Sequence, residues 1–476
     1  MLVTLLSVLS LTIMTLAPAV AEEPPADSSV LLEDRWEDAS YVSEKYQEAY
    51  AGSMYQVINK TIDADVLHNS GYYGKGVTVA LIDSGVVPVD GLSNGQIING
   101  LDVSFESQSD DLRYMDTFGH GTHLAGIIAG YDSSVDFMGI APGSRILNVK
   151  VANHEGAVDV TQVIAAIDWV IEHRNDNGMN VRVINLAYGT DSTQDWKADP
   201  LSAAVERAWR AGIVVVVAAG NDGNSSALRD PAVNPYVIAV GASDSNYTAS
   251  AVDDSVAGFS NCGTESRFAD VLAPGRSIIS LRNPGSVADV DYPEARIGDN
   301  LFLGSGTSQA SAIVSGAVAL ILDRYPNATP DMVKSALMRT SNRVSTDNKY
   351  CYQAGLIDLR DFLDEYEEWE DLKEETRSQS HGYAYGGGSL EKARGSHHIS
   401  VDGVVLNDEQ DIFGNKWNTE YVNKLAANGM IWDGGDFYGT SWSGTSWSGT
   451  SWSGTSWSGT SWSGTSWSGT SWSDYV

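Results

Sequence analysis

The chain has 476 residues, of which 42% are hydrophobic and 19% charged. This is typical of a globular α/β domain of roughly two to three hundred residues with material left at both ends. It carries 29 lysine and arginine residues against 62 aspartate and glutamate residues, so the net charge is 29 − 62 = −33. That charge repels nucleic acid and anionic membrane surfaces, and we expect neither as a partner.

The first residues have the pattern of an export signal. Residues 2–17 are almost wholly apolar, and the small-residue triplet AVA at 19–21 follows, an A-x-A cleavage pattern. No lysine or arginine precedes the apolar run. The alternative is an uncleaved membrane anchor, for which the run is short, since a spanning helix needs about 20 apolar residues. We therefore expect residues 1–21 to be removed and the protein to be secreted.

Residues 22–54 are polar and acidic, and they either cross the surface of the next domain or are removed as a short pro-segment. The strongest structural signals lie in residues 55–360. Short apolar, β-branched runs predict strands at 77–82, 145–151, 181–186, 213–219 and 236–240.

Helical patterns lie between these strands, at 158–174, 199–211 and 307–325. Thr329 as N-cap and Pro330 at the first position predict a further helix. Strands that are apolar throughout and alternate with helices predict a doubly wound, mainly parallel α/β sheet with helices on both faces. In such folds the active site lies at the carboxyl ends of the strands.

The C-terminal part has two sections. Residues 361–440 form an acidic and then glycine-rich extension, and the acidic run 358–380 predicts an exposed helix followed by a linker. Residues 441–473 repeat the unit SWSGT, with a tryptophan at every fifth position. A step of five makes no stripe on a helix, so the repeat is either a disordered aromatic tail or a narrow β-type winding. Its tryptophans either contact a cell surface or cell wall or belong to a solvated tail.

Cys262 and Cys351 are the two cysteines of the chain. Outside the cell they would form one disulfide, and two buried free thiols are the alternative. Two cysteines alone cannot make a structural zinc site.

Two residues on separate segments are candidates for proton transfer. Asp83 follows a buried strand and precedes a Ser-Gly turn, although a strand-end aspartate that caps a turn is also common. His120 lies between glycines in the segment GHGTHLAGIIAG, where a helix begins. His123 has no third metal ligand at a recognisable spacing, so we interpret it as a structural histidine.

Two further residues complete the candidate site. Ser308 lies at the start of a predicted helix of small residues, where free backbone N–H groups can hold negative charge. A serine N-cap would explain this serine but not the glycines before it. Asn221 ends the apolar run IVVVVAAGN and could donate a side-chain N–H into the same site.

With these four anchors in this order, residues 55–360 resemble the subtilisin-like serine proteases. The resemblance implies a serine endopeptidase in which Ser308 attacks the peptide carbonyl, His120 transfers the proton and Asp83 orients the imidazole. It also implies an oxyanion hole made by Asn221 and the Ser308 backbone N–H. Residues that would bind an extended substrate are Leu186, Ala187, Tyr188, Gly189, Ala218, Ala219 and Gly220.

The same resemblance leads to further expectations about substrate preference, departures from the family and bound calcium. Tyr188 would add aromatic area near the cut, and Arg229 would favour an acidic substrate residue if it points inward, a surface salt bridge being the alternative. The chain departs from the family in having Ala312 where a proline is usual and Gln309 where methionine is frequent. Family members often bind structural calcium, but no ligands can be assigned here; the chemistry itself needs no cofactor. We expect a monomer that acts on polypeptides.

Other classes of function stay open. One is a non-catalytic surface protein that keeps the fold and binds through its tryptophan repeats. Another is a processing protease with one target, held at the cell surface by those repeats.

Overall fold

The structure is a computed structural model that describes residues 35–36, 54–93, 95–246, 248–346, 348–351, 354–372, 379–401, 404–412, 415–433, 436–438 and 440–441. The predicted signal at 1–21, most of 22–54 and the repeats after residue 441 lie outside the described residues.

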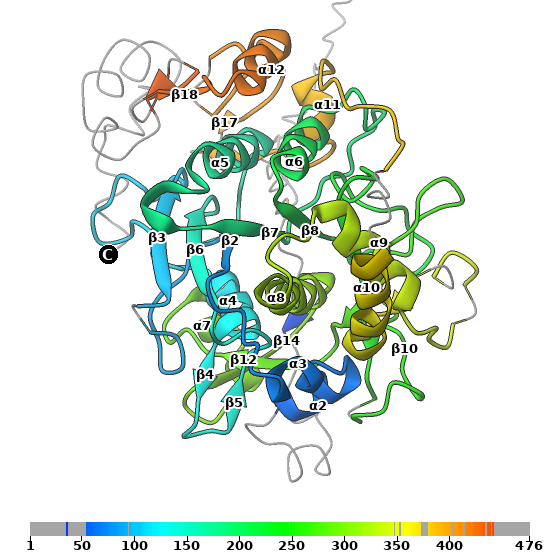
Figure 1. Cartoon of the computed structure of the whole chain (residues 1–476). Helices are drawn as coiled ribbons and strands as arrows, with labels where there is room; N and C mark the ends of the chain where they lie inside the picture. The colour runs from blue at the N-terminus through cyan, green and yellow to red at the C-terminus, as the bar shows by residue number, and fades with distance from the viewer. Residues whose placement is uncertain are drawn as a thin grey trace, which may run out of the picture.

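A large sheet forms the centre of the molecule (Figure 1). Its strand order is β15-β11-β9-β8-β7-β2-β6-β3, and every neighbouring pair along this path is parallel. In this order the strands are β15 (Gly355–Leu356), β11 (Val271–Pro274), β9 (Ile238–Asp244), β8 (Val214–Ala218), β7 (Val181–Leu186), β2 (Thr78–Asp83), β6 (Arg145–Lys150) and β3 (Ile97–Asp102). The parallel sheet and its five predicted strands are confirmed.

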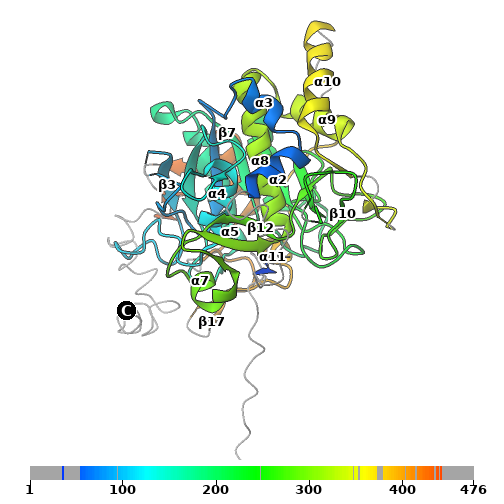
Figure 2. The same ribbon diagram turned by 90° about the horizontal axis from the view of Figure 1, so that it is seen from below.

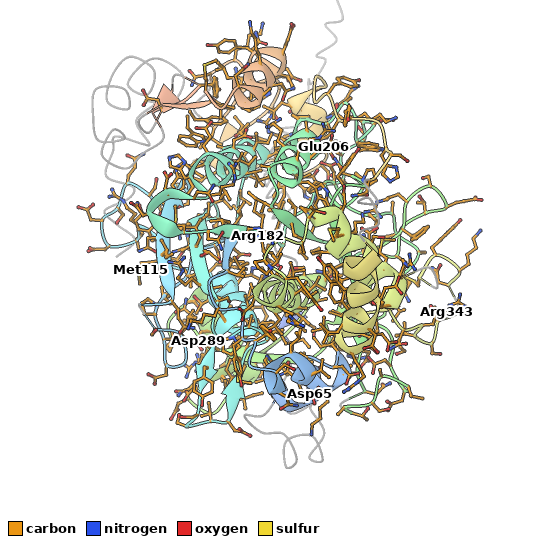
Figure 3. All side chains as sticks on the ribbon, in the orientation of Figure 1. Asp65, Met115, Arg182, Glu206, Asp289 and Arg343 are labelled. Atoms are coloured by element: carbon orange, nitrogen blue, oxygen red, sulfur yellow. A yellow bond between two sulfur atoms is a disulfide. The ribbon has the colours of Figure 1, made fainter. Side chains whose placement is uncertain are left out.

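Helices cover both faces of this sheet (Figure 1). On one side lie α5 (Val160–His173) and α6 (Pro200–Arg210), and on the other α4 (His120–Ala129) and α8 (Thr307–Arg324). Side-chain caps begin two of the predicted helices named here: Asp159 accepts from Thr161 N at 2.9 Å at the start of α5, and Thr329 Oγ1 accepts from Met332 N at 3.3 Å to begin α9 (Pro330–Thr340). Helix α8 follows Gly306 and has no side-chain cap. Side chains fill the space between the sheet and both helix layers (Figure 3).

A second, antiparallel sheet leads into the nucleophile segment. It contains β12 (Ile278–Leu281), β13 (Arg296–Ile297) and β14 (Leu301–Ser305), and the short N-terminal strand β1 (Arg35–Trp36) pairs with β14. Smaller elements are α2 (Met54–Thr61), α3 (Asp65–Asn69), α7 (Val287–Asp291), η2 (Asp176–Gly178), η3 (Pro293–Ala295), β4 (Tyr131–Asp132), β5 (Phe137–Met138) and β10 (Ser255–Val256).

The acidic run forms a helix, α10 (Leu359–Leu372), which extends from the body in Figure 2. The expectation that this helix is exposed is wrong for its first half. Phe362 is fully buried, and the ring of Tyr366 packs at a tilt against that of Tyr325, with a centroid distance of 4.2 Å. The apolar residues of this first half therefore pack on the rest of the protein, while Asp361 and Asp364 are exposed.

The C-terminal segment 379–441 lies over α5 and α6 (Figure 1). Its elements are α11 (Leu390–Arg394), α12 (Thr419–Ala427), β16 (Ser400–Val401), β17 (Val404–Val405), β18 (Trp432–Asp433), β19 (Asp436–Phe437) and β20 (Thr440–Ser441). Arg394 is fully buried and its Nε lies 2.6 Å from Asp159 Oδ2. Glu206 on α6, labelled in Figure 3, accepts from Ala384 N at 2.9 Å.

Cys262 and Cys351, both buried, are joined in a disulfide across 89 positions of sequence. Of the two alternatives left by the sequence, the structure therefore has the disulfide. Within the described ranges, no helix is both long enough and apolar enough to cross a membrane.

Candidate active site

Asp83 and His120 form a buried pair at the carboxyl edge of the sheet. Asp83 ends β2 and His120 begins α4, and Asp83 Oδ1 lies 2.7 Å from His120 Nδ1. Both side chains are almost completely buried. A carboxylate only accepts hydrogen bonds, so Nδ1 carries the hydrogen, and in the neutral ring Nε2 is then the basic nitrogen. The pair is arranged for general base catalysis through Nε2.

Asp116 fixes the start of the helix that carries His120. Its Oδ1 accepts from Gly119 N at 2.7 Å and from Ser84 Oγ at 2.7 Å, and its Oδ2 accepts from Thr122 N at 2.8 Å. Ser84 Oγ in turn accepts from Gly121 N at 3.0 Å. A carboxylate at a helix N-terminus satisfies N–H groups that have no partner within the helix. The sequence reasoning missed Asp116, although an aspartate four residues before His120 was a usable capping signal.

The glycines beside His120 are required by conformation and by space. Gly119 has φ 107°, which disfavours a residue with a β-carbon. A β-carbon on Gly121 would lie 2.1 Å from the carbonyl oxygen of Gly85 and 3.2 Å from Asp83 Oδ1. The chain of α4 thus approaches β2 closely enough for His120 to reach Asp83 only because residue 121 has no side chain.

A buried ion pair supports the strand end next to Asp83. Lys150, paired with Asp83 in the β2–β6 register, has its Nζ 2.7 Å from Glu106 Oε2 and 3.1 Å from the Ser84 carbonyl oxygen. Burial alone would raise the pKa of Glu106, but hydrogen bonds from His154 and Thr117 and the Lys150 charge lower it to about 2. Glu106 is therefore ionised at neutral pH and holds the ammonium in place.

Ser308 is the second residue of α8 and is 3% exposed. Helix α8 packs along α4, so the helices that carry Ser308 and His120 lie side by side (Figures 1 and 2). Asn221 follows β8 at the same sheet edge, and its Oδ1 accepts from Thr307 N at 2.9 Å and Thr307 Oγ1 at 3.1 Å. Because its oxygen accepts from Thr307, the NH₂ is the end of Asn221 that can act as a donor. Thr307 was not anticipated from the sequence.

The expected substrate-binding residues follow β7 and β8. Leu186 and Ala218 end these two strands, and they are buried together with Ala187 and Ala219, whereas Gly189 and Gly220 are partly exposed.

The expectation that Tyr188 adds aromatic surface for substrate is wrong. The Tyr188 side chain is only 4% exposed. Burial raises its pKa well above the usual value, and the nearby carboxylates of Asp159 and Asp230 add to that shift. The Tyr188 ring is therefore enclosed in the protein and does not form part of the exposed surface.

The remaining candidates are buried in the two helices that carry His120 and Ser308. His123 is buried within α4, and Gln309 and Ala312 are buried within α8. Among the residues that the structure describes, no group of three or more histidine, cysteine, aspartate or glutamate side chains could hold a metal ion. Structural calcium remains a prediction.

The N-terminal segment approaches the nucleophile. Strand β1 pairs antiparallel with β14, with Arg35 opposite Ser305 and Trp36 opposite Gly304. Ser305 precedes Ser308 by three residues, so the backbone at 35–36 lies along the chain that leads into the candidate nucleophile.

A parallel α/β sheet with a buried Asp-His pair at its carboxyl edge, next to a serine at a helix start, defines a serine hydrolase type of site. Residues 74–386 match the model of the subtilase family, and the chain belongs to this family of subtilisin-like serine endopeptidases.

Curated relatives agree with this membership. The chain is 40% identical over 293 residues to serine protease AprX of Bacillus subtilis strain 168, covering 60% of this chain and 65% of AprX. It is 34% identical over 303 residues to subtilisin DY of Bacillus licheniformis, covering 63% and 94%. It is 35% identical over 328 residues to subtilisin E of Bacillus subtilis strain 168, covering 67% and 74%. The chain thus spans just under two thirds of the length of AprX.

Proposed function

We propose that the protein is a secreted serine endopeptidase that hydrolyses peptide bonds through an acyl-enzyme, with Asp83, His120 and Ser308 as its triad. The observation that carries the proposal is the 2.7 Å contact between Asp83 Oδ1 and His120 Nδ1 inside a subtilase fold. This contact selects the tautomer in which Nε2 can take a proton.

The reaction follows from these groups. Nε2 of His120 accepts the Ser308 hydroxyl proton as Oγ attacks the substrate carbonyl, and Asp83 stabilises the imidazolium that forms. The new oxyanion is held by the NH₂ of Asn221 and the Ser308 backbone N–H, which lies in the first turn of α8, where N–H groups have no partner within the helix. His120 then protonates the leaving amine, and water attacks the acyl-enzyme by the same route. In subtilisin, loss of one such asparagine donor lowers kcat by about 10²–10³.

Substrate binding is proposed at the ends of β7 and β8. Gly189 and Gly220 follow these strands and are partly exposed, and an extended peptide laid beside them would pair through its backbone. Main-chain pairing tolerates many sequences, so selectivity would come from the side-chain pockets on either side.

The test is casein hydrolysis by protein that lacks residues 1–21. We expect the wild type to cleave and Ser308→Ala to be inactive, while Ser70→Ala, an exposed serine on the surface, keeps full activity. Cleavage by the Ser308→Ala variant at the wild-type rate would refute the assignment. Folded wild type that is inactive would favour the non-catalytic binding protein.

The N-terminal segment is proposed to restrain the site until it is removed. The support is the pairing of β1 with β14 just before Ser308. A chain that begins at residue 54 should then cleave casein faster than one that begins at residue 22; equal rates would exclude this restraint.

Export and contact with a cell surface through the tryptophan repeats rest on sequence alone. Culture supernatant should contain most of the activity, and a chain that ends at residue 441 should lose any binding to purified cell wall. If the truncated chain binds the cell wall as strongly as the full chain, another part of the protein is responsible for the binding.

A further inference from the structure

Gly189 and Gly220 follow the neighbouring strands β7 and β8, and both pack against the side chain of Arg229. A β-carbon on Gly189 would lie 2.6 Å from Arg229 Cβ, and one on Gly220 would lie 2.7 Å from Arg229 Cγ. Contacts that short do not occur between real side chains. The arginine stem therefore fills the space that a side chain at Gly189 would take, and it shares the space beside Gly220 with the Asn261 amide, whose Nδ2 would lie 2.5 Å from a β-carbon there.

This space lies beside the reacting bond, if the proposed function holds. Gly220 directly precedes Asn221, whose NH₂ would hold the oxygen of the scissile carbonyl. The substrate residue that contributes this carbonyl must then place its side chain next to residues 218–220. Arg229 is fixed against the same wall, because its backbone N–H donates to Ala219 O at 3.1 Å.

The charge of Arg229 is compensated within the protein. Its Nε donates to Asp222 Oδ2 at 2.8 Å, and its Nη2 pairs with Asp222 Oδ1. On the other side Nη1 lies 2.8 Å from Nε2 of His397, which belongs to the C-terminal segment. A bidentate carboxylate pair of this kind holds both the position and the charge of a guanidinium. The salt bridge that the sequence left as the alternative is therefore present, with the Arg229 side chain 18% exposed and the Asp222 side chain 29% exposed.

We propose that Arg229 determines specificity: its stem restricts the substrate residue on the acyl side of the cleaved bond to glycine, alanine or serine. Asp222 neutralises the guanidinium, so acidic residues are not recruited. His397 makes the C-terminal segment part of this specificity pocket. The inference rests on the proposed function and deepens it.

The test uses three peptide amides that differ only in the residue before the cleaved bond: alanine, phenylalanine or glutamate. We expect wild type to have a kcat/KM for alanine at least tenfold above that for the other two. R229G should raise kcat/KM for the phenylalanine peptide by roughly ten- to a hundredfold, which is the range that corresponds to burying an aromatic ring. It should change kcat/KM for the alanine peptide little. R229M keeps a stem without charge and should remain selective for alanine. R360A, which removes an exposed arginine, is the matched control and should behave as wild type.

Three results would overturn the inference. If wild type cleaves the phenylalanine peptide at the same kcat/KM as the alanine peptide, the stem does not restrict the pocket. This result does not depend on whether any variant folds. Best cleavage after glutamate would make the guanidinium a partner for an acidic substrate. If R229M cleaves the phenylalanine peptide at the same kcat/KM as R229G, the charge of Arg229 and not its stem determines the preference for alanine. Failure of the proposed function looks different: no peptide is cleaved, and a phenylmethanesulfonyl reagent does not label Ser308.

Discussion

Replacing Glu106 by glutamine should change how the stability of the protein depends on pH. The folded-state pKa of Glu106 is about 2, against 4.5 for an unperturbed glutamate. A lowered carboxyl pKa stabilises the folded state above the unfolded pKa, and this contribution is lost as pH falls from 4.5 to 2. The shift of about 2.5 units corresponds to roughly 3 kcal/mol, of which about 2 kcal/mol is gone by pH 3.

The assay is urea unfolding at pH 7, 5 and 3 in a Ser308→Ala background, which prevents self-digestion. E106Q should lower the free energy of unfolding at pH 7 by about 3–5 kcal/mol, because it leaves the buried Lys150 charge without its partner. The loss should shrink by about 2 kcal/mol at pH 3, where wild type has lost most of this contribution. E155Q, which removes an exposed acid next to His154 on the segment after β6, is the control and should change little at any pH.

A destabilisation by E106Q that is the same at pH 7 and pH 3 would refute the reasoning. It would mean that the pKa of Glu106 is the same in the folded and unfolded chains.

Three further changes test buried interactions elsewhere in the fold. Burial raises the folded pKa of Asp254 to about 7, so its stabilisation is present below pH 3.8 and lost by pH 7; D254N should raise Tm at pH 8 but not at pH 4. An equal effect at both pH values would contradict that pKa. Replacing Cys262 and Cys351 by serine opens a link across 89 positions and should lower the free energy of unfolding by about 4 kcal/mol, as measured by urea unfolding; no change would mean that the bond does not form. R394M leaves the buried carboxylate of Asp159 unpaired and should make the C-terminal segment sensitive to trypsin, whereas wild-type resistance would show that the ion pair does not hold it.

The regular part of the fold could be predicted because its signals are local. Apolar runs long enough for a strand, and caps such as Asp159 and Thr329, act through neighbouring residues. Strands such as β11 and β15 were missed, because strands of four and two residues carry too little pattern. The buried half of α10 was missed for another reason: its many carboxylates hide the apolar face that includes Phe362.

The sequence predicted which residues belong to the candidate site, but it did not predict the residues that hold them in place. The glycines on either side of His120 were visible as a motif, and the structure gives their reason in the close approach of Gly121 to Gly85. The supports of the site, Asp116 and the Glu106–Lys150 pair, come from distant segments and have no common spacing. The position of Arg229 against the C-terminal segment depends on tertiary contacts that no local pattern encodes.

The measurement that tests the central claim most directly is labelling by phenylmethanesulfonyl fluoride, followed by mass spectrometry of the digested protein. If Asp83, His120 and Ser308 act as one unit, wild type should take up one sulfonyl group per chain, located on Ser308, and H120A should take up almost none. Equal labelling of Ser308 in H120A, or labelling of another residue in wild type, would contradict the account.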